Sequence, residues 1–311
     1  MLMALAATPV WAGKVKGKPP ADEFAIPDEV NARPDVSTDS LFGFTGDAET
    51  NEEGERQLSF DIVTRAGKRA VTLDDGTPGG KGQFRVSAVR AGFDYGVTDD
   101  FDVEASIFGD LRSVRGVPDL IDKSNGNFNG ASVEFKYRLL ERTPENPVAI
   151  AVSLEPRWSR IAETEGISQN AFSLETGLML DARVIPGLLW YGVHISFEPQ
   201  VGRFRSGQVE RESSFSVSNA LSMRVLNNTY LGVEGSYKRA YAGVFANSLN
   251  GEAAFFGPTV LHNFSKTTSL SLAWSIQVWG RQKQPAPLTA HNLDLWNFDR
   301  HLVRAKLNVN F

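Results

Sequence analysis

Hydrophobic and polar residues alternate along most of this chain, in runs of roughly ten residues that turn-forming residues separate. A period of two is the signature of a β-strand whose two faces meet different surroundings. From residue 56 onward, the runs predict about twelve strands. Their approximate ranges are 56–66, 83–97, 100–111, 127–140, 148–160, 170–184, 188–201, 213–226, 229–241, 251–264, 268–280 and 299–311. The alternation slips in phase near Ala88, and Gly257-Pro258 predicts a bulge.

The connections between these runs alternate in length. Short turns are predicted at Thr98-Asp99-Asp100, Pro144–Pro147, Ile185-Pro186-Gly187, Asn227-Asn228-Thr229 and Ser265-Lys266-Thr267. Longer polar connections are predicted at 67–82, 112–126, 161–169, 202–212, 243–250 and 281–298. This alternation is typical of barrels that cross a membrane, and closure leaves no unpaired edge in the hydrocarbon. The predicted fold class is therefore all-β: a single antiparallel up-and-down transmembrane β-barrel of about 12 strands.

The polar face of the strands indicates which side meets lipid. In residues 131–139, one face carries Ala, Val, Phe, Tyr and Leu, and the other carries Ser132, Glu134, Lys136 and Arg138. Residues 270–278 likewise set Leu, Trp, Ile and Val against Ser, Ala and Gln. Small polar residues fit the curved inner wall of a narrow barrel, so we expect the apolar face to point outward.

Aromatic residues are expected to form girdles at the two membrane interfaces. Those near the short turns are Tyr95, Phe101, Tyr137, Trp190, Tyr191, Tyr230, Phe264 and Phe311. A looser set near the long connections is Phe84, Trp158, Phe172, Phe204, Phe215, Tyr241 and Trp279. The alternative explanation is that aromatic residues favour strands in general.

The last eleven residues, His301–Phe311, alternate strictly and end on an aromatic side chain. They resemble the C-terminal strand of bacterial outer-membrane β-barrels, with Leu307, Val309 and Phe311 as the assembly signal. The resemblance implies a Gram-negative outer-membrane location, contact with outer-membrane lipid, and recognition of this strand by the barrel-assembly machinery. The strand and turn pattern also resembles, more diffusely, barrel channels and transporters found beside pathways that degrade aromatic compounds; this names no substrate.

The 311 residues contain no cysteine and carry a formal net charge of −5. No stretch approaches the roughly 18 to 20 apolar residues of a membrane helix, and no cluster of Lys and Arg indicates a nucleic-acid partner. Residues 1–12 are predicted to be a signal peptide cleaved after Ala12, although no basic residue precedes the apolar run; the start could lie upstream, or the run could be a plain buried segment. Residues 13–55 are predicted to be a mobile periplasmic arm, and 56–311 the barrel. Within the arm, residues 41–44 form an apolar patch that could dock into a barrel mouth.

With the apolar face outside, charged side chains of both signs are expected to line the lumen. They are Asp102, Glu104, Glu134, Lys136, Arg138, Glu155, Arg157, Glu175, Asp181, Arg183, His194, Glu198, Arg224, Glu234, Lys238, Arg304 and Lys306. A repeated pattern, residues 152–156 and 195–199, leads us to the hypothesis that Glu155 and Glu198 form a pair of carboxylates beside Arg157. Duplication of a hairpin without a functional role explains the repeat equally well.

Three further motifs are candidates for catalysis or ligand binding. His194 and Ser196 lie two apart on one strand, as in outer-membrane lipid hydrolases, but they share the inner face with Glu198, so a hydrogen-bonded lumenal His is preferred. Gly79-Gly80-Lys81 lacks the spacing of a phosphate loop. Asp47, Glu49, Glu52, Glu53 and Glu55 are better explained as a solvated acidic run than as a calcium site. We expect no catalytic residue, no metal and no cofactor.

The sequence therefore favours passive or facilitated passage of a small solute of unknown identity through a charge-lined lumen. An outer-membrane enzyme, a plugged structural barrel and a soluble periplasmic β-protein remain as alternatives.

Overall fold

A computed structural model describes residues 40–68, 82–283 and 292–311. The chain divides into two units, residues 1–33 and 34–311, and every described residue belongs to the second. The predicted signal peptide, residues 13–39 of the predicted arm and Gly79-Gly80-Lys81 lie outside the described residues.

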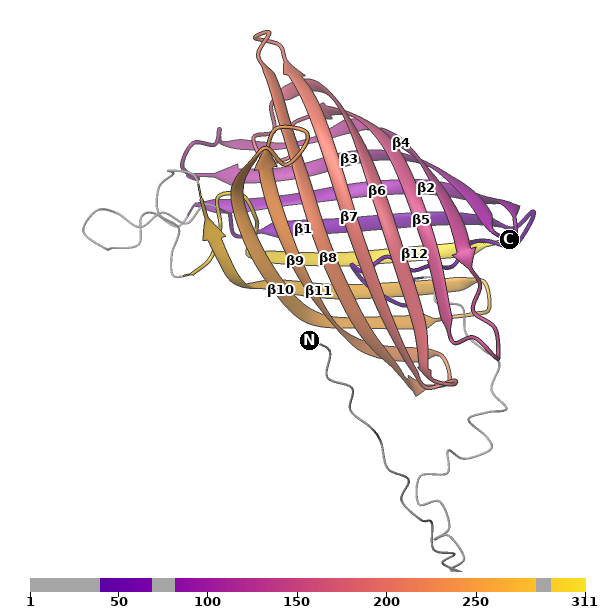
Figure 1. Cartoon of the computed structure of the whole chain (residues 1–311). Helices are drawn as coiled ribbons and strands as arrows, with labels where there is room; N and C mark the ends of the chain where they lie inside the picture. The colour runs from indigo at the N-terminus through magenta and orange to yellow at the C-terminus, as the bar shows by residue number, and fades with distance from the viewer. Residues whose placement is uncertain (1–39, 69–81, 284–291) are drawn as a thin grey trace, which may run out of the picture. The chain divides into compact units, whose positions relative to one another are not determined.

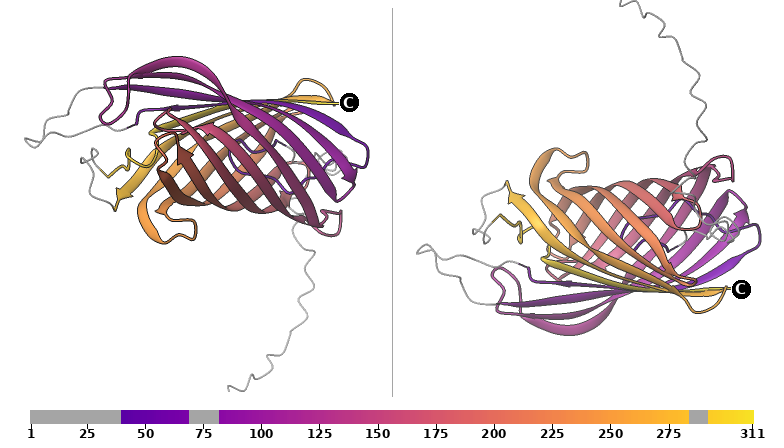
Figure 2. Two further views of the ribbon diagram at one scale, coloured as in Figure 1. Left: turned by 90° about the horizontal axis from the view of Figure 1, so that it is seen from above. Right: turned by 90° about the horizontal axis from the view of Figure 1, so that it is seen from below.

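The described residues form twelve strands that close into one barrel, which confirms the predicted fold class (Figure 1). The strands are β1 (Arg56–Ala66), β2 (Gln83–Thr98), β3 (Phe101–Arg115), β4 (Lys123–Leu140), β5 (Val148–Ile161), β6 (Ser168–Ile185), β7 (Leu189–Phe204), β8 (Val209–Leu226), β9 (Thr229–Ala242), β10 (Ser248–Asn263), β11 (Thr268–Gln282) and β12 (His301–Asn310). Each strand pairs antiparallel with the next, and β1 closes the barrel against β12 (Figure 2). No helix in the described part of the chain is long and apolar enough to cross a membrane.

The short turns gather at the end of the barrel where β1 begins and β12 ends. Between β6 and β7, Pro186 and Gly187 occupy the centre of a turn in which the nitrogen of Leu188 lies 3.0 Å from the oxygen of Ile185. Gly187 has φ +65°, a conformation that glycine adopts without steric cost. We call this end the turn end and the opposite end the loop end.

Strands at the loop end are longer than the sequence predicts. β3 continues to Arg115 and β4 already begins at Lys123, so most of the predicted 112–126 connection is paired strand. The β7–β8 hairpin extends to Phe204 and Val209 in the same way and projects beyond its neighbours in Figure 1. Beyond the hydrocarbon, polar side chains face water on both sides of a strand, so the alternation that marks a strand in the sequence disappears although the pairing continues.

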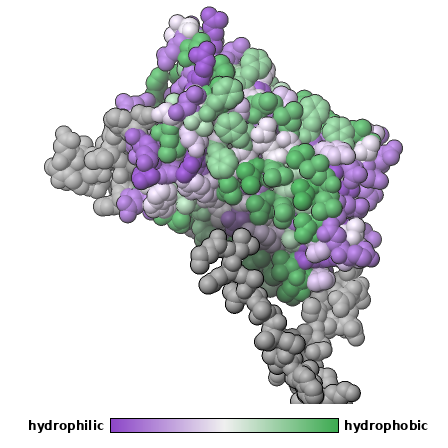
Figure 3. Space-filling view, in the orientation of Figure 1, coloured by the Kyte–Doolittle hydropathy of each residue, from purple (hydrophilic) through white to green (hydrophobic). Residues whose placement is uncertain are grey.

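The outer wall is apolar and the inner wall polar, as predicted. Phe60 and Ile107 are 51% and 58% exposed on the outside. Ser132, Ser218 and Glu155 are buried inside. Figure 3 shows the exposed hydrophobic side chains as a band across the strands, with hydrophilic residues toward both ends. A soluble β-protein would bury its aliphatic face, so that alternative is wrong.

Three predicted girdle aromatics are buried on the inner side of the wall instead. Trp190 and Tyr230 are fully buried and pack against each other edge to face at 5.6 Å between ring centroids. Phe84 is buried with Val86 and Val114 near the loop end. Period-two alternation cannot distinguish an aromatic residue that meets lipid from one that meets an apolar patch inside the barrel.

The sequence predicts a phase slip near Ala88 and a bulge at Gly257-Pro258, and the strand pairing shows neither at these positions. At Ala88 the pairing of β2 with β1 and β3 shows no shift; the hydrophobic pattern slips because the inner wall itself becomes apolar at Phe84 and Val86. The bulge predicted at Gly257-Pro258 is wrong, because the pairing register continues unbroken across these residues. The register shift between β10 and β11 falls between Ala254 and Phe255. Gly257 serves close packing instead, because a Cβ there would lie 1.7 Å from the carbonyl oxygen of Trp274.

Candidate functional site

Residues 40–55, here called the docking segment, run along the inner wall of the barrel before β1 begins. Three consecutive backbone nitrogens, those of Gly43, Phe44 and Thr45, donate to the carboxylate of Glu234 on β9. The Phe44 and Thr45 bonds are 2.7 and 3.0 Å long. Hydrogen bonds to an ionised acceptor are stronger than those between neutral groups, so Glu234 is a strong anchor for this segment.

A second anchor lies on β12. Arg304 donates from Nη1 to the carbonyl oxygen of Gly43 at 2.6 Å and pairs with Asp61 of β1 at 2.7 Å. Asn308 donates to the hydroxyl of Ser40 at 2.6 Å. Because Arg304 is fixed by Asp61, it presents a donor to the docking segment in one orientation.

The later part of the docking segment is held by the opposite wall. The nitrogen of Ala48 donates to Asp181 on β6 at 2.8 Å, and that of Asn51 donates to Asp102 on β3 at 3.3 Å. The hydroxyl of Thr50 donates to the carbonyl of Asp99, in the β2–β3 turn, at 2.7 Å. The segment therefore contacts strands around the lumen rather than one side of it.

Acidic side chains of the docking segment pair with basic side chains of the wall. Asp47 lies 3.1 Å from Lys136, and Glu49 pairs with Arg138 and Arg142. Burial opposes ionisation of Asp47, but the charges of Lys136 and Lys306 outweigh it and lower the pKa of this carboxyl below its ordinary value. Asp47 and Glu49 thus contact the wall instead of belonging to the predicted solvated run, whereas Glu52 and Glu53 are exposed as that prediction requires. Among the described residues, no group of three or more His, Cys, Asp or Glu side chains is arranged to hold a metal.

The first residues of the docking segment fill an apolar pocket in the wall. Leu41 and Phe42 are buried with Trp190, Tyr230 and Leu261. Gly192 leaves space for this contact, since a Cβ there would lie 2.4 Å from the Phe42 ring. The inward-facing Trp190 and Tyr230 thus have a partner that the strand pattern does not reveal.

Six carboxylates form a single row across six consecutive strands. In the pairing register, Asp94 lies opposite Glu104 and Glu104 opposite Glu134. Glu155 pairs directly with Glu175. The residue pairs on either side place Glu134 opposite Glu155 and Glu175 opposite Glu198. The row is Asp94, Glu104, Glu134, Glu155, Glu175 and Glu198 on β2 to β7. Because the strands of a barrel tilt, a row perpendicular to them climbs along the barrel axis.

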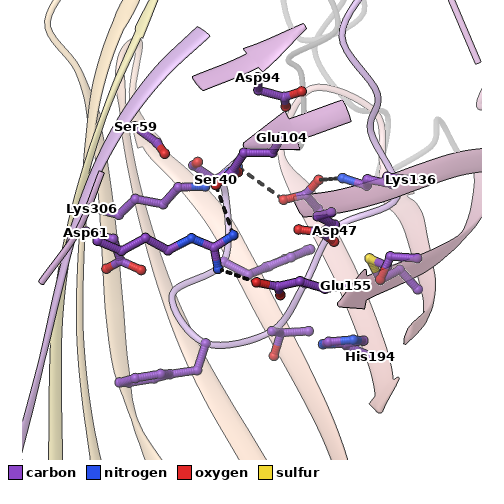
Figure 4. Close-up of a pocket in the computed structure, with 18 of the residues that line it drawn as sticks. Ser40, Asp47, Ser59, Asp61, Asp94, Glu104, Lys136, Glu155, His194 and Lys306 are labelled. Atoms are coloured by element: carbon purple, nitrogen blue, oxygen red, sulfur yellow. Dashed lines mark hydrogen bonds and ion pairs between the residues drawn. The ribbon is translucent and has the colours of Figure 1, made fainter. Parts of the chain in front are cut away.

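Basic side chains neutralise part of this row. Arg90 lies 3.1 Å from Glu104 and 3.1 Å from Glu155, and it bridges these two carboxylates. Figure 4 shows Glu104 and Glu155 among the side chains that line one cavity of the lumen. Arg157 lies 3.4 Å from Glu155. Among the described residues, Glu134, Glu175 and Glu198 form no ion pair at this distance. The row therefore keeps an excess of carboxylate.

Two cavities of about 220 and 400 Å³ lie along the lumen. The smaller is lined by the docking segment and by five members of the carboxylate row, Asp94 to Glu175. The larger, toward the loop end, contains the sixth, Glu198, together with Glu163, Glu165, Glu210 and Glu212. Acids outnumber Lys and Arg side chains in both linings.

The side chains predicted to line the lumen fall into three groups. Asp102, Lys136, Arg138, Asp181, Glu234 and Arg304 bind the docking segment. Glu104, Glu134, Glu155, Glu175, His194 and Lys306 line the smaller cavity, and Arg157 and Glu198 the larger. Arg183 donates to the carbonyl of Thr143, Arg224 stacks on Trp190 and Tyr230, and Lys238 lies over Phe255.

Sequence reasoning missed Arg90, Asp94 and Asp61, which also line the smaller cavity. The first two lie on β2, where the apolar inner residues obscured the phase. Asp61 alternates with Phe60 and Ile62 on β1 and could have been found from that pattern.

Glu155 and Glu198 do not form the isolated pair of carboxylates that the sequence suggested. The two side chains line different cavities, and Glu175 lies between them in the row. Arg157 contacts Glu155 directly, and the charge of Glu198 also acts on it. The repeat thus marks two members of a longer row rather than an isolated pair.

His194 lines the smaller cavity, but its Nε2 atom is buried without a hydrogen-bond partner among the described residues. The hydroxyl of Ser196 lies 2.9 Å from that of Ser216 on β8. The Nε2 atom therefore does not support the prediction that His194 is hydrogen-bonded. Ser196 is hydrogen-bonded to another hydroxyl and not to His194.

A closed twelve-stranded barrel with an apolar outer wall and a polar lumen is an outer-membrane β-barrel. The chain belongs to the family of unknown function DUF6662, whose model matches residues 34–311. Among curated proteins, none matches.

Several solved structures are similar to this barrel. The COG4313 outer membrane channel from Pseudomonas putida F1 is 13% identical, with a TM-score of 0.58 over 86% of this chain and 98% of that one. The NanC porin is 10% identical, with a TM-score of 0.47 over 81% and 98% of the two chains. A mutant of the TodX monoaromatic hydrocarbon channel is 9% identical, with a TM-score of 0.40 over 84% and 90%. The closed topology and the likeness to the COG4313 channel confirm, at the level of the fold, the resemblance to outer-membrane barrels seen in the sequence.

Proposed function

We propose that this protein is an outer-membrane channel for small solutes and that its lumen favours cations over anions. The observation that carries the proposal is the row of six carboxylates from Asp94 to Glu198, which passes from one cavity to the other. Side chains of one sign along a path attract counter-ions and repel ions of their own sign. The fold shared with a solved outer-membrane channel supports passage but carries no information on the solute.

The docking segment controls this passage at the turn end. It occupies the lumen beside the smaller cavity and is anchored by Glu234, Arg304, Asp181 and Asp102. Most of these contacts are hydrogen bonds between a charged side chain and backbone groups. Because such bonds can break and form again, the docking segment can leave the lumen and return. Release of the segment would join the smaller cavity to the periplasmic space.

A plugged structural barrel is the second candidate, because the same anchors favour permanent closure. Leu41 and Phe42 add apolar burial, and removing two such side chains from a buried pocket costs about 3–6 kcal/mol in total. The two candidates differ in whether the segment leaves the lumen under native conditions.

Single-channel recording of the refolded chain in a planar bilayer separates them, once the heat-dependent gel shift of a folded barrel has been seen. We expect brief conductance steps and, in a salt gradient, a reversal potential on the cation side. A variant that lacks residues 40–48 should give long openings with the same cation preference. A barrel that stays silent with and without this segment is structural, and an anion-side reversal potential would refute the proposed preference.

A further inference from the structure

Charged side chains on the outer wall have a different composition from those in the lumen. Among outward-facing strand positions, the charged residues near the loop end are Arg85, Arg115, Arg160, Arg203, Arg211, Arg239, Arg281 and Glu252. Each arginine lies within about four residues of the loop end of its strand. Seven of these eight side chains are therefore guanidinium groups, whereas the inner wall carries both signs.

The arginines are distributed around the barrel on β2, β3, β5, β7, β8, β9 and β11. We call them the arginine girdle. Arg85 pairs with Ser113 and Gln83 with Arg115, so Arg85 and Arg115 are diagonal neighbours on one face. Arg203 and Arg211 are related in the same way across β7 and β8. All but Arg239, which is half-buried, are exposed.

Glu252 is the one acidic residue among these outward charged side chains, and it forms ion pairs with two arginines of the girdle. Its carboxylate lies 2.7 Å from Arg281 and 3.4 Å from Arg239, and it accepts a hydrogen bond from the hydroxyl of Tyr237. The Glu252 side chain is 5% exposed, whereas those of Arg239 and Arg281 are 42% and 58% exposed. One covered acid thus orients two guanidinium groups outward and leaves one positive charge uncompensated.

The other five arginines, Arg85, Arg115, Arg160, Arg203 and Arg211, form no ion pair with any described residue. They lie directly beyond the apolar band, next to side chains such as Leu111 and Val201 that are exposed on the outer wall. A guanidinium at this height reaches the headgroups of the adjacent leaflet while its methylenes stay on apolar surface.

The turn end lacks such a girdle. Outward strand positions at this end carry apolar residues such as Tyr95, Leu139 and Val225. In the described strands, Arg56 is the one charged side chain at these positions. In outer-membrane barrels, the short turns face the periplasm and the longer loops face outside. The girdle therefore lies at the outer leaflet.

We propose that the arginine girdle binds the phosphate groups of the phosphorylated glycolipid that forms the outer leaflet. Guanidinium groups bind phosphate through two parallel hydrogen bonds, and clusters of basic residues at a membrane surface recognise anionic headgroups. The paired arginines on β2 and β3, on β7 and β8, and around Glu252 are the contact points. This binding is independent of whether the lumen conducts.

The test is a lipid titration of the purified folded barrel in a neutral detergent, read by native mass spectrometry. The probes are diphosphoryl lipid A, its dephosphorylated form and phosphatidylglycerol. Wild type should bind diphosphoryl lipid A about tenfold or more tighter than either of the others, and added salt should weaken this binding. Equal binding of the dephosphorylated form would overturn the proposal without any variant, and equal binding of phosphatidylglycerol would replace it by a general preference for anionic lipid.

Variants then locate the site. Arg239→Gln with Arg281→Gln, and separately Arg85→Gln with Arg115→Gln, should each lower the affinity for diphosphoryl lipid A by about tenfold. Arg56→Gln is the matched control: it removes an outward arginine at the turn end and should leave the affinity unchanged. Unaltered affinity in both double variants, or an equal loss in Arg56→Gln, would refute the girdle as the binding site.

Discussion

The backbone nitrogen of Thr45 lies 3.0 Å from the carboxylate of Glu234, although 189 residues separate them in the chain. The same carboxylate accepts bonds from the two preceding nitrogens, so one side chain on β9 holds three consecutive residues of the docking segment. This contact joins the part of the chain before the barrel to the wall of its lumen, and the behaviour of the channel should depend on it.

Glu234→Gln should loosen the docking segment. The amide keeps an acceptor oxygen but loses the charge that strengthens three hydrogen bonds, and the open probability in planar bilayers should rise by about tenfold. Glu198→Gln is the control, since it removes a lumenal carboxylate that does not touch the segment. Equal opening of wild type and Glu234→Gln would mean that the segment does not limit conduction.

Gly192→Ala should have a similar effect through shape alone. A Cβ at this position would lie 2.4 Å from the ring of Phe42, so the ring must leave its pocket. Gly235→Ala is the matched control, because the nearest atom to its Cβ would be 3.7 Å away. The chain has no cysteine, so a single Phe44→Cys reports docking by its rate of maleimide labelling. Labelling should accelerate with Gly192→Ala and stay unchanged with Gly235→Ala.

Glu134→Gln combined with Glu175→Gln should reduce the cation preference. Two carboxyl groups disappear from the carboxylate row, and the ratio of cation to anion permeability should fall by roughly twofold or more. The reversal potential in a salt gradient measures this ratio. Glu252→Gln removes a carboxylate from the outer wall and should not change it. An unchanged ratio in the double variant would show that the row does not face the conduction path.

Acid should release the docking segment. The pKa of Asp47 is lowered in the docked state, so its ion pairs favour docking above the ordinary pKa of about 3.9 and lose this effect as the pH falls through the docked value. Open probability should therefore be constant from about pH 5 to 8 and increase below about pH 4. Asp47→Asn should open more often at neutral pH and respond less to acid. An identical pH profile in this variant would assign the response to another carboxyl.

The carboxylate row could be predicted from the sequence only in part. The lumenal position of Glu104, Glu134, Glu155, Glu175 and Glu198 follows from the alternation within each strand, because each side chain shares a face with small polar residues. Their arrangement in one row does not follow, since it depends on register between strands. Neighbouring acids and bases in the sequence instead suggested a balanced wall.

The sequence by itself determined that the chain forms about twelve strands, that they close into a barrel and that the apolar face points outward, because these properties follow from a local period of two and from turn residues such as Pro186 and Gly187. Only the tertiary structure decided that Trp190 and Tyr230 turn inward to receive Phe42, that Glu234 binds the backbone before the barrel, and that Asp94 lines up with Glu198. These contacts join residues far apart in the chain, and their geometry depends on strand register and on the width of the closed lumen, which no local pattern encodes.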